Sequence, residues 1–271
     1  MLKPIASLSL ALSLSFASAM AHANNFEAIQ RQAIQGDKDA QYQLSELYFD
    51  GKGVDADIEQ AINWARKAAE QGQLDAQLSL AMLYHMSDLV HKDMKKTLQW
   101  YARAMAQGST DAMINVGAIF NWGESMGVKQ SFSKAAYFYK KAADLGDPYG
   151  MYYLGTLYDT YREDPPIRNL EKSREYLQKA ADLGLEDAQH DLFFLVYDLT
   201  ADNLATDEDA YFWFEVLRHH EDYDAQTYQV FEKELKVNPE QKQEIALKAK
   251  TYYEQAAERW EAYEASQKLR P

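Results

Sequence analysis

The sequence of 271 residues contains no cysteine. A fold without cysteine needs no disulfide for its stability and tolerates an oxidising compartment. It also offers no thiol that could act as a nucleophile. The absence therefore excludes disulfide-dependent domains and cysteine-dependent enzymes.

The sequence contains fewer basic than acidic residues. Lysine and arginine number 28 against 42 aspartate and glutamate residues, which gives a formal net charge of −14. Such a surface repels the phosphates of nucleic acids and anionic lipids, and electrostatic steering favours a cationic partner. The acidity also has a simpler explanation, since net charge keeps a protein soluble. With either explanation, we expect no nucleic-acid partner.

Long apolar runs are missing after residue 23. Before it, Lys3 is followed by an apolar run over residues 5–16 and by Ala21-His22-Ala23, a small-x-small cleavage motif. This order is typical of a secretory signal peptide and predicts cleavage after Ala23, with a periplasmic or secreted product. A membrane anchor is the alternative, but the run is shorter than the ~20 apolar residues that span a bilayer. We expect no membrane insertion.

Catalytic motifs are also missing. The sequence has no G-x-S-x-G or HExxH motif, and Gly51-Lys52-Gly53 resembles a phosphate loop only superficially. One grouping is metal-like and consists of His219, His220, Glu221, Asp222 and Asp224. Two adjacent histidines do not share a helix face, so a solvated loop explains this grouping better than a metal site. We expect no enzyme activity, no cofactor and no metal.

A repeat of 36 to 38 residues fills most of the chain. Each copy carries three anchors at i, i+4 and i+8, namely Ala40, Leu44, Tyr48; Ala76, Leu80, Tyr84; Ala112, Val116, Phe120; Gly150, Leu154, Tyr158; and Ala188, Leu192, Val196. This spacing places the anchors on one face of a helix. A second helix follows in each copy, and in the first copy we expect Trp64 to be buried in it. A period of this size predicts an all-α solenoid of helix-turn-helix units.

Glycine and acidic residues mark the helix boundaries. Gly51 and Gly72 suit the left-handed backbone past a helix end, and Asp57 is typical of a helix start. Asn238, followed by Pro239, begins a final helix that runs to about Lys268. The charged faces of this last helix are those of a terminal capping element.

The pattern A-x-x-x-L-x-x-x-Y, G-x-G-V and A-x-x-W-x-x-K-A-A-x-x-G resembles the Sel-one-like repeat, a relative of the tetratricopeptide repeat. In the first copy the matching residues are Ala40, Leu44, Tyr48, Gly51, Gly53, Val54, Ala61, Trp64, Lys67, Ala68, Ala69 and Gly72. Later copies match at Trp100, Tyr101, Gly108, Gly127, Val128, Ala135, Tyr139, Lys141, Ala142, Ala143, Gly146, Lys179, Ala180, Ala181 and Gly184. The resemblance implies a right-handed α/α solenoid that acts as an adaptor or scaffold for protein–protein contacts.

The repeat gives the expected domain organisation. A signal peptide covers residues 1–23, and the solenoid of about five repeats covers residues 24–222. Its units lie near residues 39–74, 75–110, 111–148, 149–186 and 187–222. A degenerate repeat and the capping helix follow over residues 223–271.

If the units stack as the resemblance implies, the first helices line a concave groove. The residues that point into it are Tyr42, Glu46, Phe49, Leu78, Met82, His85, Met86, Ile114, Asn121, Trp122, Tyr152, His190, Phe194 and Tyr197. Such a density of aromatic and Met residues is typical of peptide-binding and protein-binding surfaces. The alternative is that some of them pack against the neighbouring first helix as core. We expect the groove to bind, with its centre at Met82, Met86 and Trp122.

The sequence therefore predicts a non-enzymatic, periplasmic adaptor that binds a protein or peptide in its concave groove. One alternative is an immunity or inhibitor protein that neutralises an envelope-targeting toxin or enzyme. Another is a cell-wall or β-lactam-ligand-binding enzyme, as in some cysteine-rich members of the family. The absence of cysteine argues against that subgroup. The sequence does not indicate an oligomeric state.

Overall fold

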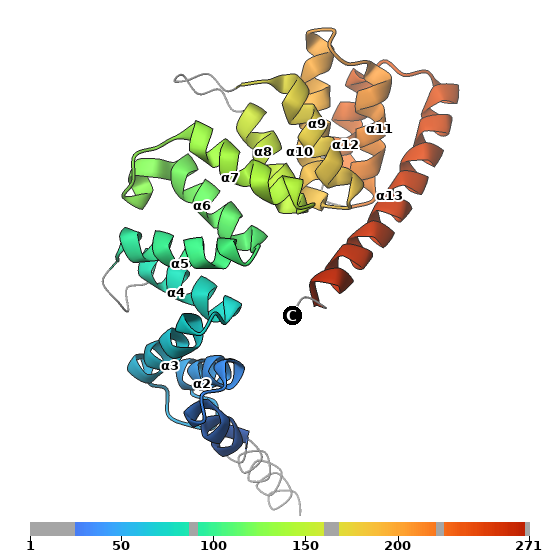
Figure 1. Ribbon diagram of the computed structural model, residues 1–271. Helices are drawn as coiled ribbons and strands as arrows, with labels where there is room; N and C mark the ends of the chain where they lie inside the picture. The colour runs from blue at the N-terminus through green and yellow to red at the C-terminus, as the bar shows by residue number, and fades with distance from the viewer. Residues whose placement is uncertain (1–24, 87–91, 160–167, 221–224, 269–271) are drawn as a thin grey trace, which may run out of the picture. The chain divides into compact units, whose positions relative to one another are not determined.

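The computed structural model describes residues 25–86, 92–159, 168–220 and 225–268, and every regular element in these ranges is helical (Figure 1). Residues 25–34 form a helix that precedes α2. The following helices are α2 (Lys38–Asp50), α3 (Ile58–Glu70), α4 (Leu74–Met86), α5 (Met94–Ala106), α6 (Thr110–Trp122), a short 3-10 helix η1 (Gly123–Met126), α7 (Phe132–Asp144), α8 (Pro148–Asp159), α9 (Leu170–Asp182), α10 (Glu186–Ala201), α11 (Asp207–Arg218), α12 (Ala225–Glu234) and α13 (Pro239–Lys268). The predicted all-α repeat fold is confirmed.

The helix boundaries follow the predicted signals. Gly51 ends α2 with a φ of 69°, in the left-handed region that only glycine adopts without strain. Asp57 caps α3 and accepts a hydrogen bond of 3.0 Å from the Gln60 backbone N–H. At α13, Asn238 accepts one of 2.9 Å from the Gln241 backbone N–H. Capping of this kind satisfies the free N–H groups of a first turn, which explains why short polar residues stand at these positions.

Small residues form the interior of each repeat. Ala61, Ala65, Ala68 and Ala69 of α3 are all buried, which lets neighbouring helices approach closely. Trp64 is only half-buried, so the expectation of a buried tryptophan is wrong. Its ring lies against the core while the Lys67 ammonium stands 3.7 Å from the ring centroid.

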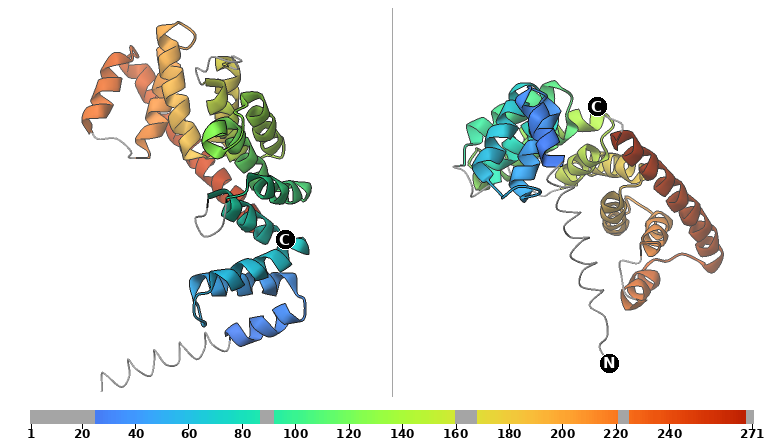
Figure 2. Two further views of the ribbon diagram at one scale, coloured as in Figure 1. Left: turned by 90° about the vertical axis from the view of Figure 1, so that its left-hand side faces the viewer. Right: turned by 90° about the horizontal axis from the view of Figure 1, so that it is seen from below.

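The chain divides into two compact units. The first contains the residues up to Ala112 together with Met126–Val128, and the second contains Met113–Ser125 and the residues from Lys129 onward. In the first unit, α2 and α3 pack as an antiparallel pair, as Figure 2 shows. In the described ranges, no helix combines the length and the apolar composition needed to span a bilayer.

The second unit ends in an aromatic core that α13 covers. Phe193, Phe214 and Trp213 are buried in this core, and α13 packs against α11 (Figure 1). Tyr252 of α13 donates a hydrogen bond of 3.0 Å to Asp182 at the end of α9. The predicted capping helix over residues 239–268 is therefore confirmed.

Candidate partner-binding pocket

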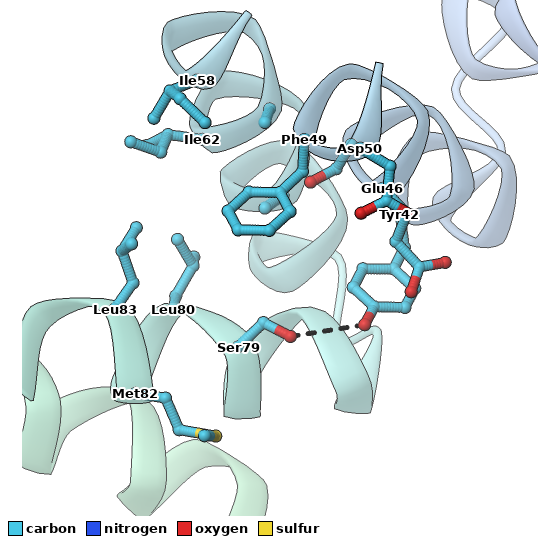
Figure 3. Close-up of a pocket in the computed structure, with 13 residues that line it drawn as sticks. Tyr42, Glu46, Phe49, Asp50, Ile58, Ile62, Ser79, Leu80, Met82 and Leu83 are labelled. Atoms are coloured by element: carbon cyan, nitrogen blue, oxygen red, sulfur yellow. Dashed lines mark hydrogen bonds between the residues drawn. The ribbon is translucent and has the colours of Figure 1, made fainter. Parts of the chain in front are cut away.

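An apolar pocket of about 470 Å³ lies in the first unit between α2, α3 and α4 (Figure 3). The residues that line it are Tyr42, Ser45, Glu46, Phe49, Asp50, Ile58, Ala61, Ile62, Ala65, Ser79, Leu80, Met82 and Leu83. The α2 residues Tyr42, Glu46 and Phe49 follow a spacing of four and three, which places them on one helix face. The helical period of α2 therefore explains why these three residues line the same side of the pocket.

Two large apolar side chains of the pocket are exposed. Phe49 projects into the pocket from α2 (Figure 3) and is 54% exposed, and Met82 of α4 is 46% exposed. Ile58 and Ile62 line the pocket from α3. A contiguous apolar surface of this kind is typical of a site that binds another molecule.

Polar groups stand at the edge of the pocket. The Tyr42 hydroxyl lies 3.3 Å from Ser79 Oγ, and burial raises the pKa of Tyr42 above its ordinary value. Glu46 and Asp50 add two carboxylates. Asp50 forms an ion pair of 2.6 Å with Lys52, but both side chains are exposed, so that pair contributes little.

The structure separates the predicted groove residues of the first unit into two groups. Tyr42, Glu46, Phe49 and Met82 line the pocket. Leu78 and His85 are half-buried outside it. The Nε2 atom of His85 instead lies 3.1 Å from the Met126 sulfur, and burial lowers the pKa of His85. Met86 ends α4, and its side chain lies outside the described residues.

In the second unit, the predicted groove residues of the third repeat differ in exposure. Trp122 is 54% exposed, whereas Ile114 packs against the buried cluster around Tyr139. Asn121 is half-buried, and its carbonyl oxygen accepts a hydrogen bond of 2.7 Å from Gln130.

The predicted groove residues that contact α10 and α12 have partners within the chain. Tyr152 donates a hydrogen bond of 3.1 Å to Asp191. The His190 ring lies 4.9 Å from the Phe194 ring. Phe194 and Tyr197 lie 6.2 and 5.4 Å from the ring of Phe231 in α12. Helix α12 therefore covers the part of the predicted groove that contains Phe194 and Tyr197.

Three apolar residues that line the pocket were not predicted from the sequence. Ile58, Ile62 and Leu83 line it, but the prediction considered only fixed positions on the first helices. A signal for two of them was present, because Ile58 and Ile62 form an aliphatic i, i+4 pair at the start of the second helix.

The expectation that the metal-like grouping is a solvated loop is wrong at His220, which has partners inside the fold. His220 is almost fully buried, and its Nε2 atom lies 2.7 Å from Gln189 Oε1. His219 stacks on Tyr253 with ring centroids 5.1 Å apart. Glu221, Asp222 and Asp224 lie outside the described residues, and within the described ones no cluster could hold a metal ion.

Several solved structures resemble the chain. A Sel1 repeat protein from Oxalobacter formigenes is 30% identical, with a TM-score of 0.56, and the match covers 64% of this chain and 69% of that one. The protective antigen c5321 of uropathogenic Escherichia coli, which has an SLR fold, is 24% identical with a TM-score of 0.58. That match covers 96% of this chain but only 63% of the antigen, and at this identity it shows the fold alone.

A more distant likeness is to the immunity protein Pa5087 from Pseudomonas aeruginosa. It is 20% identical with a TM-score of 0.34, and the match covers 58% of this chain and 74% of that one. A likeness at this level carries no functional argument. No curated protein matches the chain significantly.

The Sel1 repeat profile matches five segments, over residues 38–73, 74–109, 110–147, 148–185 and 246–259. The first four each begin one residue before a predicted unit. The predicted unit at 187–222 has no match, and the fifth matched segment lies within α13. The matched segments cover more than half of the sequence, and the chain belongs to the Sel1 repeat family.

Proposed function

We propose that the chain is an exported, non-enzymatic binding scaffold whose apolar pocket takes a segment of a partner protein. The observation that carries this proposal is the exposure of Phe49 and Met82 in a pocket walled by three helices. Exposed side chains of these types at a concave surface are the usual anchors of protein recognition.

The chemistry of the pocket indicates the partner segment. Ile58, Ile62 and Leu83 favour an apolar side chain, because burying apolar area is the main source of affinity in such a pocket. Glu46 and Asp50 at the edge favour a neighbouring lysine or arginine. The expected segment therefore combines apolar and basic residues.

Export is a separate part of the proposal and rests on the sequence. Lys3, the apolar run over residues 5–16 and Ala21-His22-Ala23 are typical of a signal peptide. The intact mass of the protein recovered from the periplasm or medium should correspond to a chain that begins at Asn24. An uncleaved cytoplasmic product would contradict the proposed localisation.

The pocket is tested by selecting peptides from a random library against the wild-type protein. The selection is counter-screened against the double variant Phe49→Ala/Met82→Ala. Peptides that depend on the pocket should combine apolar and basic residues, and their affinity for the double variant should fall by about tenfold or more. Isothermal titration calorimetry measures both affinities.

A matched control uses an exposed aromatic outside the pocket. Tyr137 is 55% exposed on α7, so Tyr137→Ala removes a similar amount of surface and should leave peptide affinity unchanged. If the selected peptides bind the pocket variant as tightly as the wild type, the pocket is not the binding site.

A further inference from the structure

A second cleft in the first unit has a basic character that is unusual for so acidic a chain. It has a volume of about 630 Å³ and lies between α3, α4 and α5. Arg66, Lys96 and Arg103 line it together with Tyr84 and Trp100. The chain as a whole has a net charge of −14, so three cations in one cleft stand against the general charge of the protein.

Aromatic residues contact all three cationic side chains of the cleft. Arg66 Nη2 lies 3.4 Å from the Tyr84 hydroxyl, and the Arg103 guanidinium lies 4.6 Å from the Trp100 ring centroid. Lys96 stands 4.8 Å from the Tyr84 ring centroid and 3.5 Å from an Asp93 carboxylate oxygen. Stacking on a ring leaves the N–H edge of a guanidinium free to donate hydrogen bonds.

The second unit contains equivalent helix positions two repeats further along the chain. The cationic side chains at these positions form ion pairs with carboxylates. Arg66 is the ninth residue of α3 and Arg103 the tenth of α5, and the equivalent residues of α7 and α9 are Lys140 and Lys179. Lys140 lies 2.7 Å from Asp144, and Lys179 lies 2.5 Å from Glu175. Among the described residues, no carboxylate forms an ion pair with Arg66 or Arg103.

One substitution accounts for part of this difference. Glu175, the partner of Lys179, is the sixth residue of α9, and the sixth residue of α5 is the neutral Gln99. A glutamate at this position would lie four residues before Arg103, the spacing at which side chains pair on a helix. On the Arg103 side, the cleft therefore lacks a carboxylate that the equivalent site in the second unit supplies from within the chain. On the Arg66 side, Glu70 stands at the position of Asp144 but is not in an ion pair with Arg66, so the Arg66 contact proposed below depends on that pair staying open.

We propose that this cleft binds a short acidic segment of a partner protein, whose carboxylates pair with Arg66 and Arg103 while Lys96 lies at the rim. Guanidinium groups match carboxylates with two parallel hydrogen bonds, which makes them the preferred partners for such a segment. A long polyanion such as a nucleic acid would also meet the acidic surface of the rest of the chain, which disfavours it.

The test uses rhodamine-labelled hexaglutamate, with labelled hexaglutamine as the neutral probe, in fluorescence anisotropy titrations at about 20 mM salt, where screening is weak. Hexaglutamate should bind the full-length protein saturably and hexaglutamine should not. The double variant Arg66→Gln/Arg103→Gln should weaken binding by about tenfold or more, since it removes both charge-assisted contacts. The matched control Lys140→Gln/Lys179→Gln makes the same charge change at the equivalent positions and should stay within about twofold.

A third variant tests the missing carboxylate directly. Gln99→Glu keeps every cation of the cleft but gives Arg103 a partner within the chain, so it should weaken hexaglutamate binding by about threefold or more. Phe49→Ala/Met82→Ala should leave this binding unchanged, which separates the cleft from the apolar pocket. Thermal melting of each variant confirms that it is folded.

Several outcomes would overturn the proposal. Equal loss in the two double variants would mean that hexaglutamate responds only to overall charge, and no saturable binding would remove the site altogether. If inorganic phosphate displaces hexaglutamate when both supply the same concentration of negative charge, the cleft would be a site for small anions instead. Tighter binding of a single-stranded oligonucleotide than of hexaglutamate would assign it to nucleic acid.

Discussion

Phe49 and Tyr197 stand at the same position of two repeats but have different surroundings. Each follows the leucine anchor of its first helix by five residues, Leu44 in one case and Leu192 in the other. Phe49 is 54% exposed in the apolar pocket. Tyr197 packs edge-on against Phe231 of α12, with ring centroids 5.4 Å apart, and its hydroxyl donates a hydrogen bond to Glu234.

The difference separates two properties of a side chain in the repeat. Its direction is determined by the repeat itself, whereas its exposure depends on the neighbouring elements. The helical period directs both side chains to the equivalent face of a first helix. Whether that face is open depends on the next element of the chain, because α12 covers Tyr197 and no described element covers Phe49 to the same extent. The predictions below test how far the covered and the open regions differ.

The largest effect is expected in the covered region. Phe193 is completely buried, and its ring lies 5.1 Å from Phe231 and 6.3 Å from Phe214. Phe193→Ala should lower the free energy of unfolding by about 3–5 kcal/mol through the cavity that it leaves. Urea unfolding measures this loss. A loss below about 1 kcal/mol would mean that the aromatic core is not tightly packed.

A medium effect is expected at a hydrogen bond that only some repeats contain. Gln77 is buried, donates a hydrogen bond of 3.0 Å to the Ala69 carbonyl and accepts one of 2.9 Å from Gln107. The third repeat has Met113 and Leu145 at these two positions. Gln77→Met alone should cost about 1–2 kcal/mol, because the Ala69 carbonyl loses one of its two donors and Gln107 loses its acceptor.

The double variant Gln77→Met/Gln107→Leu provides the control for this prediction. It copies the pair of the third repeat and removes both side-chain amides, so it should recover about half or more of the lost free energy. Thermal and urea unfolding of the two single variants and the double variant give the coupling. If the loss of unfolding free energy in the double variant equals the sum of the losses in the two single variants, the two glutamines do not act as a pair.

A smaller effect is expected from the contact that holds α12 over Tyr197. The hydrogen bond to Glu234, together with burial, raises the pKa of Tyr197 to about 12. A raised pKa means that the folded state favours the protonated phenol, so this stabilisation is complete below about pH 10 and is lost as the pH rises towards 12.

Tyr197→Phe tests this pH dependence. It should cost about 1 kcal/mol at pH 8. The difference in unfolding free energy between this variant and the wild type should shrink above pH 10. A difference that stays constant up to pH 12 would show that the hydroxyl does not stabilise the α12 contact.

Much of the fold could be predicted because repeated positions reinforce one another. Gly51, Asp57 and Asn238 each mark a helix end for a local reason, and the structure places the ends there. The fifth repeat was harder to interpret, because Phe193 stands where Gly117 and Gly155 stand in the third and fourth. A Cβ atom on Gly117 would lie 2.5 Å from the Tyr139 ring, so in the third repeat this position needs glycine, which lets the two helices pack closely.

Less of the candidate site could be predicted, because it depends on contacts between elements. The spacing on α2 gave Tyr42, Glu46 and Phe49, which the structure brings to one pocket. The same spacing also gave Phe194 and Tyr197, and the sequence held no sign that α12 would cover them. Their binding role and that of the other predicted groove residues stays a prediction.

The smallest effect on stability is expected in the open region. Phe49→Ala removes a side chain that is already 54% exposed, so it should change the free energy of unfolding by no more than about 0.5–1 kcal/mol. The same substitution should weaken pocket-dependent peptides about tenfold, because an aromatic anchor contributes to binding only when a partner buries it. Unfolding and peptide titration on one sample measure both quantities. A loss of about 3 kcal/mol or more would show that Phe49 is core, as Phe193 is, and the contrast between the open and the covered repeat would disappear.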